Sequence, residues 1–252
     1  IILDKQLLFL EKLMNKKDFT FILPAAGKST RFKSKKSKIF YYYKNKFLIN
    51  YVIDKSLKFT KNIIIISNKR NLKELQNILQ KYKKIKFKII IQKEQKGMGH
   101  AINIAMNKVK TRYSTVIWPD QIYLSVSTIK KTIDFFLKKK SILCFPVYNK
   151  KLPYVYILRD KNKNFKDIIQ TRETDKIIKS GESDCGIFVF KSKIMREKLK
   201  YLINKKLIIT TRTKEIDFLK SFKFLSKFGR VDTVRAQSYR DTIGINFLKD
   251  LI

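Results

Sequence analysis

The residues best suited to chemistry lie in one loop near the start of the chain. A short apolar run, Phe19-Thr20-Phe21-Ile22-Leu23, leads directly into Pro24-Ala25-Ala26-Gly27-Lys28-Ser29-Thr30-Arg31. Small side chains let main-chain N–H groups approach a phosphate closely, and glycine adopts backbone conformations that other residues avoid. Lys28, Arg31 and Lys38 add positive charge, and an arginine suits forked contact with phosphate oxygens. These residue types predict a triphosphate site.

Two interpretations of this loop are open on its residues alone. The loop lacks the Walker pattern, in which four residues separate a glycine from Gly-Lys-Ser/Thr, and it lacks the G-x-G-x-x-G dinucleotide fingerprint. An ordinary strand-to-helix turn in a lysine-rich chain explains its composition equally well. The choice therefore depends on residues elsewhere in the chain.

Few residues are available for nucleophilic or zinc chemistry. His100 is the only histidine, and Cys144 and Cys185 lie in apolar segments without metal-ligand spacing. A Ser-His or Cys-His mechanism would have to use His100, and no nucleophile motif surrounds it. The cysteines indicate buried thiols in a reducing cytosol, so we expect a cytoplasmic protein.

The formal net charge of +38 raises the possibility of a nucleic-acid-binding protein. Lysine far outnumbers arginine, its positions are scattered over all the expected elements, and Ile, Asn, Phe and Tyr are also abundant. This composition is typical of A/T-rich coding, so we expect no specific nucleic-acid partner. A basic nucleic-acid-binding protein is kept as an alternative, with salt-sensitive duplex binding as its mark.

Alternating apolar runs and helical patterns fill the first half of the chain. Strands are predicted at 19–23, 62–67, 87–92 and 115–118, and helices at 47–59, 71–82 and 99–108. This alternation predicts right-handed βαβ units and a mostly parallel sheet flanked by helices, a Rossmann-like α/β fold. Ligands bind beyond the carboxyl ends of the strands in such a sheet, and the loop lies at one of those ends.

The second half predicts an extension of the sheet with its own short strands. Strands are expected at 142–148, 154–159, 164–169, 185–190 and 230–236, helices at 192–203 and 215–228, and a loop or short strand at 207–211. Residues 1–17 predict an amphipathic helical extension and 18–252 a single domain. We expect no membrane span, because no apolar run is long enough.

Further segments match the motifs of one family in the order of the chain. They are Gln92-Lys93-Glu94-Gln95-Lys96-Gly97-Met98-Gly99-His100-Ala101, Trp118-Pro119-Asp120, Glu182-Ser183-Asp184-Cys185-Gly186-Ile187 and Thr242-Ile243-Gly244-Ile245-Asn246. With the loop and Lys38, they resemble the sugar-phosphate nucleotidyltransferases. The resemblance covers nearly the whole chain from Phe21. Within that family it is strongest to the uridyltransferase (pyrophosphorylase) domains of bacterial N-acetylglucosamine-1-phosphate uridyltransferases.

The resemblance implies an enzyme that condenses an NTP, with UTP favoured, and a sugar 1-phosphate into a nucleotide sugar and pyrophosphate. It implies a Mg²⁺ cofactor, a small β-rich sugar-binding sub-lobe and a place in nucleotide-sugar supply for cell-envelope polysaccharide. Transfers of this kind depend on positioning and charge stabilisation, which agrees with a chain almost without histidine.

The resemblance also assigns roles to individual residues. The catalytic residues are Arg31, Lys38 and Asp120, and the Mg²⁺ ligands are Asp120 and Asn246. The nucleotide contacts are Ala25, Ala26, Gly27, Lys28, Gln92, Gln95, Gly97 and Met98. The sugar contacts are Val155, Gln170 and Asp184. Turn or helix-cap roles would explain Asp120 or Asn246 taken singly, and His100 is expected to pack or cap.

The chain departs from the family pattern at several of these positions. Ser29 replaces a glycine, Met98 a threonine, Val155 a glycine, Gln170 a glutamate and Asp184 an asparagine. The identities of the NTP and the sugar are therefore open, as are the oligomeric state and any domain after Ile252. Alternatives are a cytidylyl- or molybdopterin-type nucleotidyltransferase with another acceptor, and a non-catalytic nucleotide-binding relative. Arg172 and Lys191 are interpreted as surface charges.

Overall fold

The structure is a computed structural model that describes residues 15–27, 32 and 37–252. The expected N-terminal helical extension therefore lies almost wholly outside the described residues, and its boundary at residue 17 stays a prediction. Where the description starts, Lys16–Asp18 form a 3-10 turn (η1) that leads into the first strand. No helix within the described ranges is long and apolar enough to cross a membrane.

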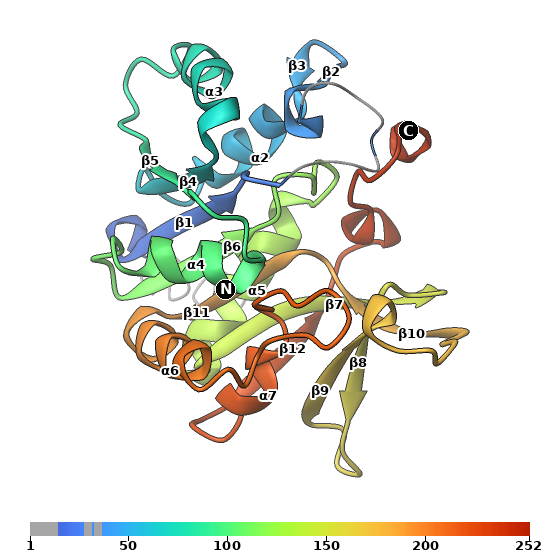
Figure 1. The fold of residues 1–252 in the computed structure, drawn as a ribbon. Helices are drawn as coiled ribbons and strands as arrows, with labels where there is room; N and C mark the ends of the chain where they lie inside the picture. Colours follow the sequence, from blue (N-terminus) through green and yellow to red (C-terminus); the bar gives the residue numbers. More distant parts are fainter. Residues whose placement is uncertain (1–14, 28–31, 33–36) are drawn as a thin grey trace, which may run out of the picture.

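The centre of the molecule is an eight-stranded mixed sheet (Figure 1). Its strands are β1 (Phe19–Pro24), β4 (Ile63–Ser67), β5 (Lys88–Ile91), β6 (Tyr113–Ile117), β7 (Leu143–Lys151), β10 (Ser180–Asp184), β11 (Ile187–Lys191) and β12 (Val231–Arg235). The order is β10-β7-β11-β6-β1-β4-β5, with β12 beside β7. Strands β6, β1, β4 and β5 are parallel, whereas β11 is antiparallel to both of its neighbours.

Helices cover both faces of this sheet because its strands are apolar on both faces. They are α2 (Leu48–Ser56), α3 (Leu72–Leu79), α4 (Met98–Met106), α5 (Val126–Lys139), α6 (Ser192–Asn204) and α7 (Ser221–Leu225). In β1, Phe21 and Leu23 pack in one cluster with α2, α3 and α5, while Ile22 packs in the other with α4, α6 and α7. The alternation follows from the two-residue repeat of a strand. The predicted α/β fold class is confirmed.

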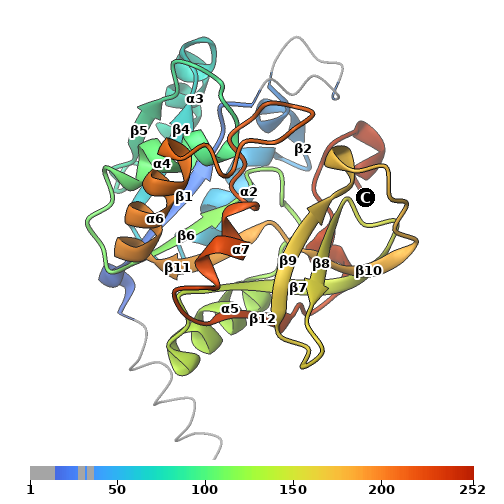
Figure 2. The same cartoon turned by 60° about the horizontal axis from the view of Figure 1, so that its bottom comes forward.

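A two-stranded hairpin that is not hydrogen-bonded into the main sheet packs against β10 and corresponds to the expected sub-lobe (Figure 2). Its strands, β8 (Val155–Arg159) and β9 (Phe165–Gln170), are antiparallel, and Val155 pairs with Gln170 across them. A second small hairpin, β2 (Tyr42–Tyr43) and β3 (Lys46–Phe47), was not predicted. The turn residues Lys44 and Asn45 both have positive φ, which an asparagine accepts more readily than most residues.

One predicted element is wrong. The sequence pattern over 215–228 predicts a single helix, but α7 covers only Ser221–Leu225. Upstream of it the chain is extended, because Ile216 forms an antiparallel bridge with Ile209 and the Asp217 N–H donates to Ile208 O at 2.8 Å. Tertiary pairing replaces the helical hydrogen bonds in this segment, although its apolar spacing is helical.

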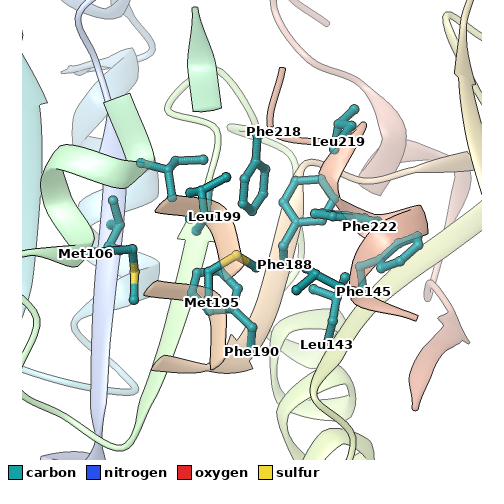
Figure 3. Packing of buried hydrophobic residues seen from close by; sticks show 14 of the residues in the cluster. Met106, Leu143, Phe145, Phe188, Phe190, Met195, Leu199, Phe218, Leu219 and Phe222 are labelled. Carbon is teal, nitrogen blue, oxygen red and sulfur yellow. The ribbon is translucent and has the colours of Figure 1, made fainter. Parts of the chain in front are cut away.

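An aromatic cluster fixes the position of α7 on the sheet (Figure 3). Phe188 of β11 lies 5.2 Å from Phe222 and 5.7 Å from Phe218, measured between ring centroids, and both partners are fully buried. Trp118, the only tryptophan, packs 5.1 Å from Phe188. The indole therefore reports on the packing of this cluster.

We predict that Phe188→Ala lowers the free energy of unfolding by about 3–5 kcal/mol, because the ring is fully buried and its removal leaves a cavity. Urea unfolding followed by Trp118 fluorescence measures the change. Phe228→Ala is the control, since that ring is 50% exposed and should cost less than about 1 kcal/mol. Equal effects of the two substitutions would contradict the packing described.

Candidate functional site

The carboxyl ends of the parallel strands carry the predicted phosphate loop. Beyond β1, the Ala25 N–H donates to Ile66 O of β4 at 2.7 Å, so the first loop residue is still held to the sheet. Ala25 and Ala26 are buried, and a Cβ at Gly27 would meet no atom of the described residues within 4 Å. Lys28 and Arg31 lie outside the described residues, so their predicted roles stay predictions.

An ion pair joins segments that are far apart in the sequence. Lys38 begins a 3-10 turn, η3 (Lys38–Phe40), and its Nζ donates to Asp120 Oδ2 at 2.5 Å and to Ile245 O at 2.7 Å. The Ile245 N–H in turn donates to Asp120 O at 3.0 Å. The structure therefore brings together Lys38, Asp120 and the segment that carries Asn246, as the sequence motifs predict.

The oxygen atoms at this point suit a magnesium ion. Asp120 Oδ1 is buried and has no hydrogen-bond partner among the described residues. Asn246 donates its Nδ2 to Gly244 O at 3.3 Å, so its side-chain oxygen is the atom that a cation would bind. No group of three or more His, Cys, Asp or Glu that could hold a metal occurs in the described ranges. A carboxylate and an amide fit Mg²⁺, which keeps waters and binds substrate phosphates as further ligands.

The predicted base-recognition segment lies beside the phosphate loop. Gln92 follows β5, is 4% exposed, and donates its Nε2 to Gly97 O at 3.3 Å. Gln95 donates its Nε2 to Ala26 O at 2.6 Å, and Asn68 donates to the same oxygen at 3.0 Å. A hollow of about 500 Å³ is lined by Asn68, Lys69, Gln92, Lys93 and Gln95. Amide side chains therefore surround a cavity next to the loop.

His100 and Gly97 have structural positions in this segment. The His100 Nδ1 atom lies 3.1 Å from Glu94 O and 3.3 Å from Gln92 Nε2, which fits the expected packing role. Gly97 has φ +97, and a Cβ there would lie 2.7 Å from Ile216 O. Any other residue would therefore displace the neighbouring chain. Met98 is 36% exposed at the start of α4.

The predicted sugar residues fall into two places. Val155 and Gln170 are the cross-strand pair of the hairpin, and Val155 is 7% exposed within the core. Asp184 ends β10 and accepts a hydrogen bond from the Gly186 N–H at 2.7 Å. The Trp118 N–H donates to Gly186 O at 2.9 Å, so Asp184 lies on the turn beside the Asp120 segment.

Burial raises the pKa of the Asp184 carboxyl to about 6, against its ordinary value of 3.8. The hydrogen bond from Gly186 and the nearby Lys150 oppose this rise, and the charge of Asp120 adds to it. Ionisation of Asp184 therefore lowers the stability of the folded state.

Residues outside the predicted set also belong to this region. Gln121 is 7% exposed, and its Oε1 has no hydrogen-bond partner among the described residues. Its side chain fills the space beside Gly186 and Gly244, where a Cβ would lie 2.6 and 2.9 Å from Gln121 atoms. Asn68 was also missed, although it follows β4 as Gln92 follows β5. Its place at a strand end is the signal that could have identified it.

Arg172 was expected to be a surface charge, but it is partly buried and paired. Its guanidinium lies 3.2 Å from Glu215 Oε2 and 3.5 Å from Asp217 Oδ2, measured from Nη1 and Nη2. Burial disfavours its charge, yet Tyr154, Glu215 and Asp217 together raise the pKa of Arg172 above its ordinary value. It acts as a fixed cation between the hairpin and residues 215–217.

A mostly parallel α/β sheet with a carboxylate, a lysine and amide side chains at its strand ends defines a nucleotide-handling domain. Residues 21–183 match the MobA-like NTP transferase domain family, and the chain belongs to that family. The family relationship predicted from the motifs is confirmed.

Known proteins agree with this assignment. The chain is 28% identical over 237 residues to the bifunctional protein GlmU of Thermodesulfovibrio yellowstonii, covering 91% of this chain and 50% of that protein. It therefore spans about half the length of the curated relatives it matches.

Solved structures share the fold. A glucose-1-phosphate thymidylyltransferase from Bacillus anthracis, in complex with sucrose, superposes with a TM-score of 0.72 at 16% identity over 88% of each chain. An apo UDP-glucose pyrophosphorylase gives a TM-score of 0.71 at 18% identity, covering 92% of this chain and 95% of that one.

We predict that Asp184→Asn stabilises the protein more at about pH 7.5 than at about pH 4. The folded-state pKa of Asp184 lies above its unfolded value, so its ionisation opposes folding. The destabilisation by the ionised carboxylate is absent well below pH 3.8. It grows between pH 3.8 and about 6 and reaches its full size above that interval. Thermal melting in EDTA should show a gain of a few degrees at the higher pH.

Asp160→Asn is the control for this prediction because its sign is opposite. The Asn164 N–H holds the pKa of Asp160 below its ordinary value, so that carboxylate stabilises the fold above its unfolded pKa and the contribution is lost as the pH falls. Asp160→Asn should therefore be less stable than the wild-type protein at the higher pH. An Asp184→Asn gain that does not depend on pH would contradict the burial of that carboxyl.

Proposed function

We propose that this chain is a Mg²⁺-dependent nucleotidyltransferase that condenses an NTP, with UTP favoured, and a sugar 1-phosphate into a nucleotide sugar and pyrophosphate. One observation carries the proposal. Asp120 Oδ1 is buried and has no hydrogen-bond partner within the described part of the chain. It lies on a carboxylate that Lys38 holds in place, next to the segment bearing Asn246, at the carboxyl ends of parallel strands. Membership of the NTP transferase family supports the same chemistry.

Asp120 and the side-chain oxygen of Asn246 would hold the magnesium ion. When bound, the ion supplies positive charge to the phosphate oxygens at which negative charge builds. Lys38 contributes a second positive charge at the same place and fixes the Asp120 carboxylate through its hydrogen bond. The Ala25 N–H is held by Ile66 O, so the main chain at Ala26 and Gly27 would offer the N–H groups beyond β1, where a triphosphate would lie.

The sugar 1-phosphate oxygen would attack the α-phosphorus of the NTP. The bond from phosphorus to the bridging oxygen then breaks, and pyrophosphate leaves with the electron pair. No covalent enzyme intermediate is needed, so the residues act by positioning and by charge stabilisation. This fits a site whose residues are amides, a lysine and a carboxylate.

The hollow lined by Gln92 and Gln95 would take the base. A primary amide offers a donor and an acceptor together, which matches the edge of uracil or thymine. The anionic Asp184 and the bulk of Val155 would shape the sugar pocket, so acetylated and non-acetylated amino sugars both belong in a substrate test. A nucleotide sugar of this kind would feed envelope polysaccharide synthesis from the cytoplasm.

We predict that Asp120→Ala lowers Mg²⁺-dependent pyrophosphate release by at least about 100-fold, because removal of one preorganised charge from such a site costs that much. Release is measured over a matrix of UTP, dTTP, CTP and GTP against hexose and amino-sugar 1-phosphates. Cytidylyl transfer to a non-sugar acceptor would appear as CTP use without sugar dependence, and a non-catalytic relative as NTP binding without release.

Asp134→Ala is the matched control for Asp120→Ala. Asp134 also forms an ion pair with a lysine, Lys130, at 2.7 Å, but it lies on α5 away from the strand ends. Its replacement should leave turnover within about twofold, since pairs of this kind contribute little. Near-normal turnover by a folded Asp120→Ala protein would overturn the metal assignment.

We predict that Lys38→Ala also lowers turnover by about 100-fold while leaving the apparent Mg²⁺ requirement in place. The reason is that Lys38 supplies charge and holds Asp120 but is no ligand to the ion. Lys46→Ala, which breaks the 2.7 Å pair with Asp54, is the control. A loss smaller than a few-fold in Lys38→Ala would show that the lysine has another role.

A further inference from the structure

A ten-residue segment that was predicted to be partly helical runs across the molecule between α6 and α7. We name residues 208–217 the strap. Its two ends are held together, because Ile209 and Ile216 form an antiparallel bridge and the Asp217 N–H donates to Ile208 O at 2.8 Å. The Thr210 N–H donates to Glu215 O at 3.0 Å within the same turn. In Figure 2 this orange-red segment lies between α4 and the hairpin of β8 and β9.

On one side the strap holds the segment expected to recognise the base. The Ile216 N–H donates to Lys96 O at 2.8 Å, and the Gly99 N–H donates to Ile216 O at 2.8 Å. Gly97 and Gly99 leave no space for a side chain here, since a Cβ at either would lie within 2.8 Å of strap atoms. The base-recognition segment is therefore in direct main-chain contact with the strap.

On the other side the strap holds the sugar-side hairpin. Gln170, the last residue of β9, donates its Nε2 to Asp217 Oδ2, and Arg172 Nη2 lies 3.5 Å from the same oxygen. Asp217 is 4% exposed, and its Oδ1 accepts the Lys220 N–H at 3.1 Å. Both oxygens of this buried carboxylate are thus engaged.

We propose that Asp217 is a positioning residue that orients the Gln170 amide toward the sugar and joins the hairpin to the base-recognition segment through Ile216. This inference rests on the proposed function for its substrate. A carboxylate only accepts hydrogen bonds, so Asp217 fixes which end of the Gln170 amide faces it. The NH₂ group is turned to Asp217. Oε1 makes no side-chain hydrogen bond within the described ranges, so it would accept one from a hydroxyl or N–H group of the substrate.

The strap therefore has a defined chemical consequence. The site presents an oxygen acceptor at Gln170, and the matching substrate group is a donor such as a sugar hydroxyl. Because Ile216 and Asp217 are adjacent, a shift of the hairpin is passed directly to the main chain at Lys96 and Gly99. Arg172, fixed by Glu215 and Asp217, closes the same junction.

A double-mutant cycle tests the action of Asp217 through Gln170. We expect Asp217→Asn to raise KM for the sugar 1-phosphate about 10-fold or more, as loss of a hydrogen bond to a charged group does. KM for the NTP and kcat should change less than about threefold. Gln170→Ala should raise the same KM by a similar factor, and the double variant no further than the larger single effect. If the KM increases of the two single variants multiply in the double variant, the proposal is overturned.

Asp167→Asn is the matched control. Asp167 lies on the same strand as Gln170 and pairs with Lys223 of α7 at 2.9 Å, but neither of these residues belongs to the strap. This variant should leave KM for both substrates within about twofold, because a single partly exposed ion pair contributes little. A KM increase equal to that of Asp217→Asn would mean that any weakening of the hairpin has the same effect, which would also overturn the proposal.

Hydrogen–deuterium exchange tests the coupling between the hairpin and the base-recognition segment without an activity measurement. Asp217→Asn and Gln170→Ala should each speed exchange of the Gly99 and Ile216 amides about fivefold or more, while Asp167→Asn leaves them unchanged. Unchanged exchange in all variants would overturn the coupling even in an active enzyme. A wild-type protein that releases no pyrophosphate with any substrate pair would instead contradict the proposed function, and the exchange result would stand on its own.

Discussion

The ion pair between Lys38 and Asp120 is the contact on which the rest of the site depends. Taking a carboxylate and an ammonium out of water is costly, and the cost is offset only when the geometry is good and further hydrogen bonds are made. Here Lys38 also bonds to Ile245 O, and Ile245 bonds back to Asp120 O. The remaining Asp120 oxygen is buried without a described partner, a state that costs about 1–3 kcal/mol for a polar group. A bound cation would remove that cost.

Much of this arrangement could be predicted from local patterns. The runs that form β1 and β4 are apolar except for Thr20 and Ser67, as in strands buried on both faces. The residues that follow these strands lie where ligands bind in such sheets. Asp120 and Asn246 were identified through motifs, and the structure brings their segments together. Local patterns alone do not predict that these two segments lie close together, because their proximity depends on how segments far apart in the chain pack.

The features that the sequence did not predict share one physical cause. The residues 215–228 have helical spacing, but main-chain bonds from Ile216 to Lys96 and from Asp217 to Ile208 hold the start of this segment extended. The burial of Gln121 depends on the absence of side chains at Gly186 and Gly244, which no pattern around Gln121 indicates. Asp217 likewise lies in a segment predicted to be helical, and only the folded structure places Gln170 against it. In each case a contact distant in sequence overrides a local preference.

The two halves of the proposed site are built on different parts of the sheet, and this makes their alignment a separate problem. The nucleotide side lies at the ends of the parallel strands β1, β4 and β5, whereas the sugar side lies on the antiparallel β10 and on a hairpin outside the main sheet. An in-line transfer tolerates little error, since a misplacement of about 1 Å can cost about 100-fold in rate. The Trp118–Gly186 hydrogen bond fixes the end of β10 to the Asp120 segment, and the ion pair between Arg159 and Glu182 joins the hairpin to β10. The strap adds a direct connection from the hairpin to the base-recognition segment, because its adjacent residues Ile216 and Asp217 bond to opposite halves.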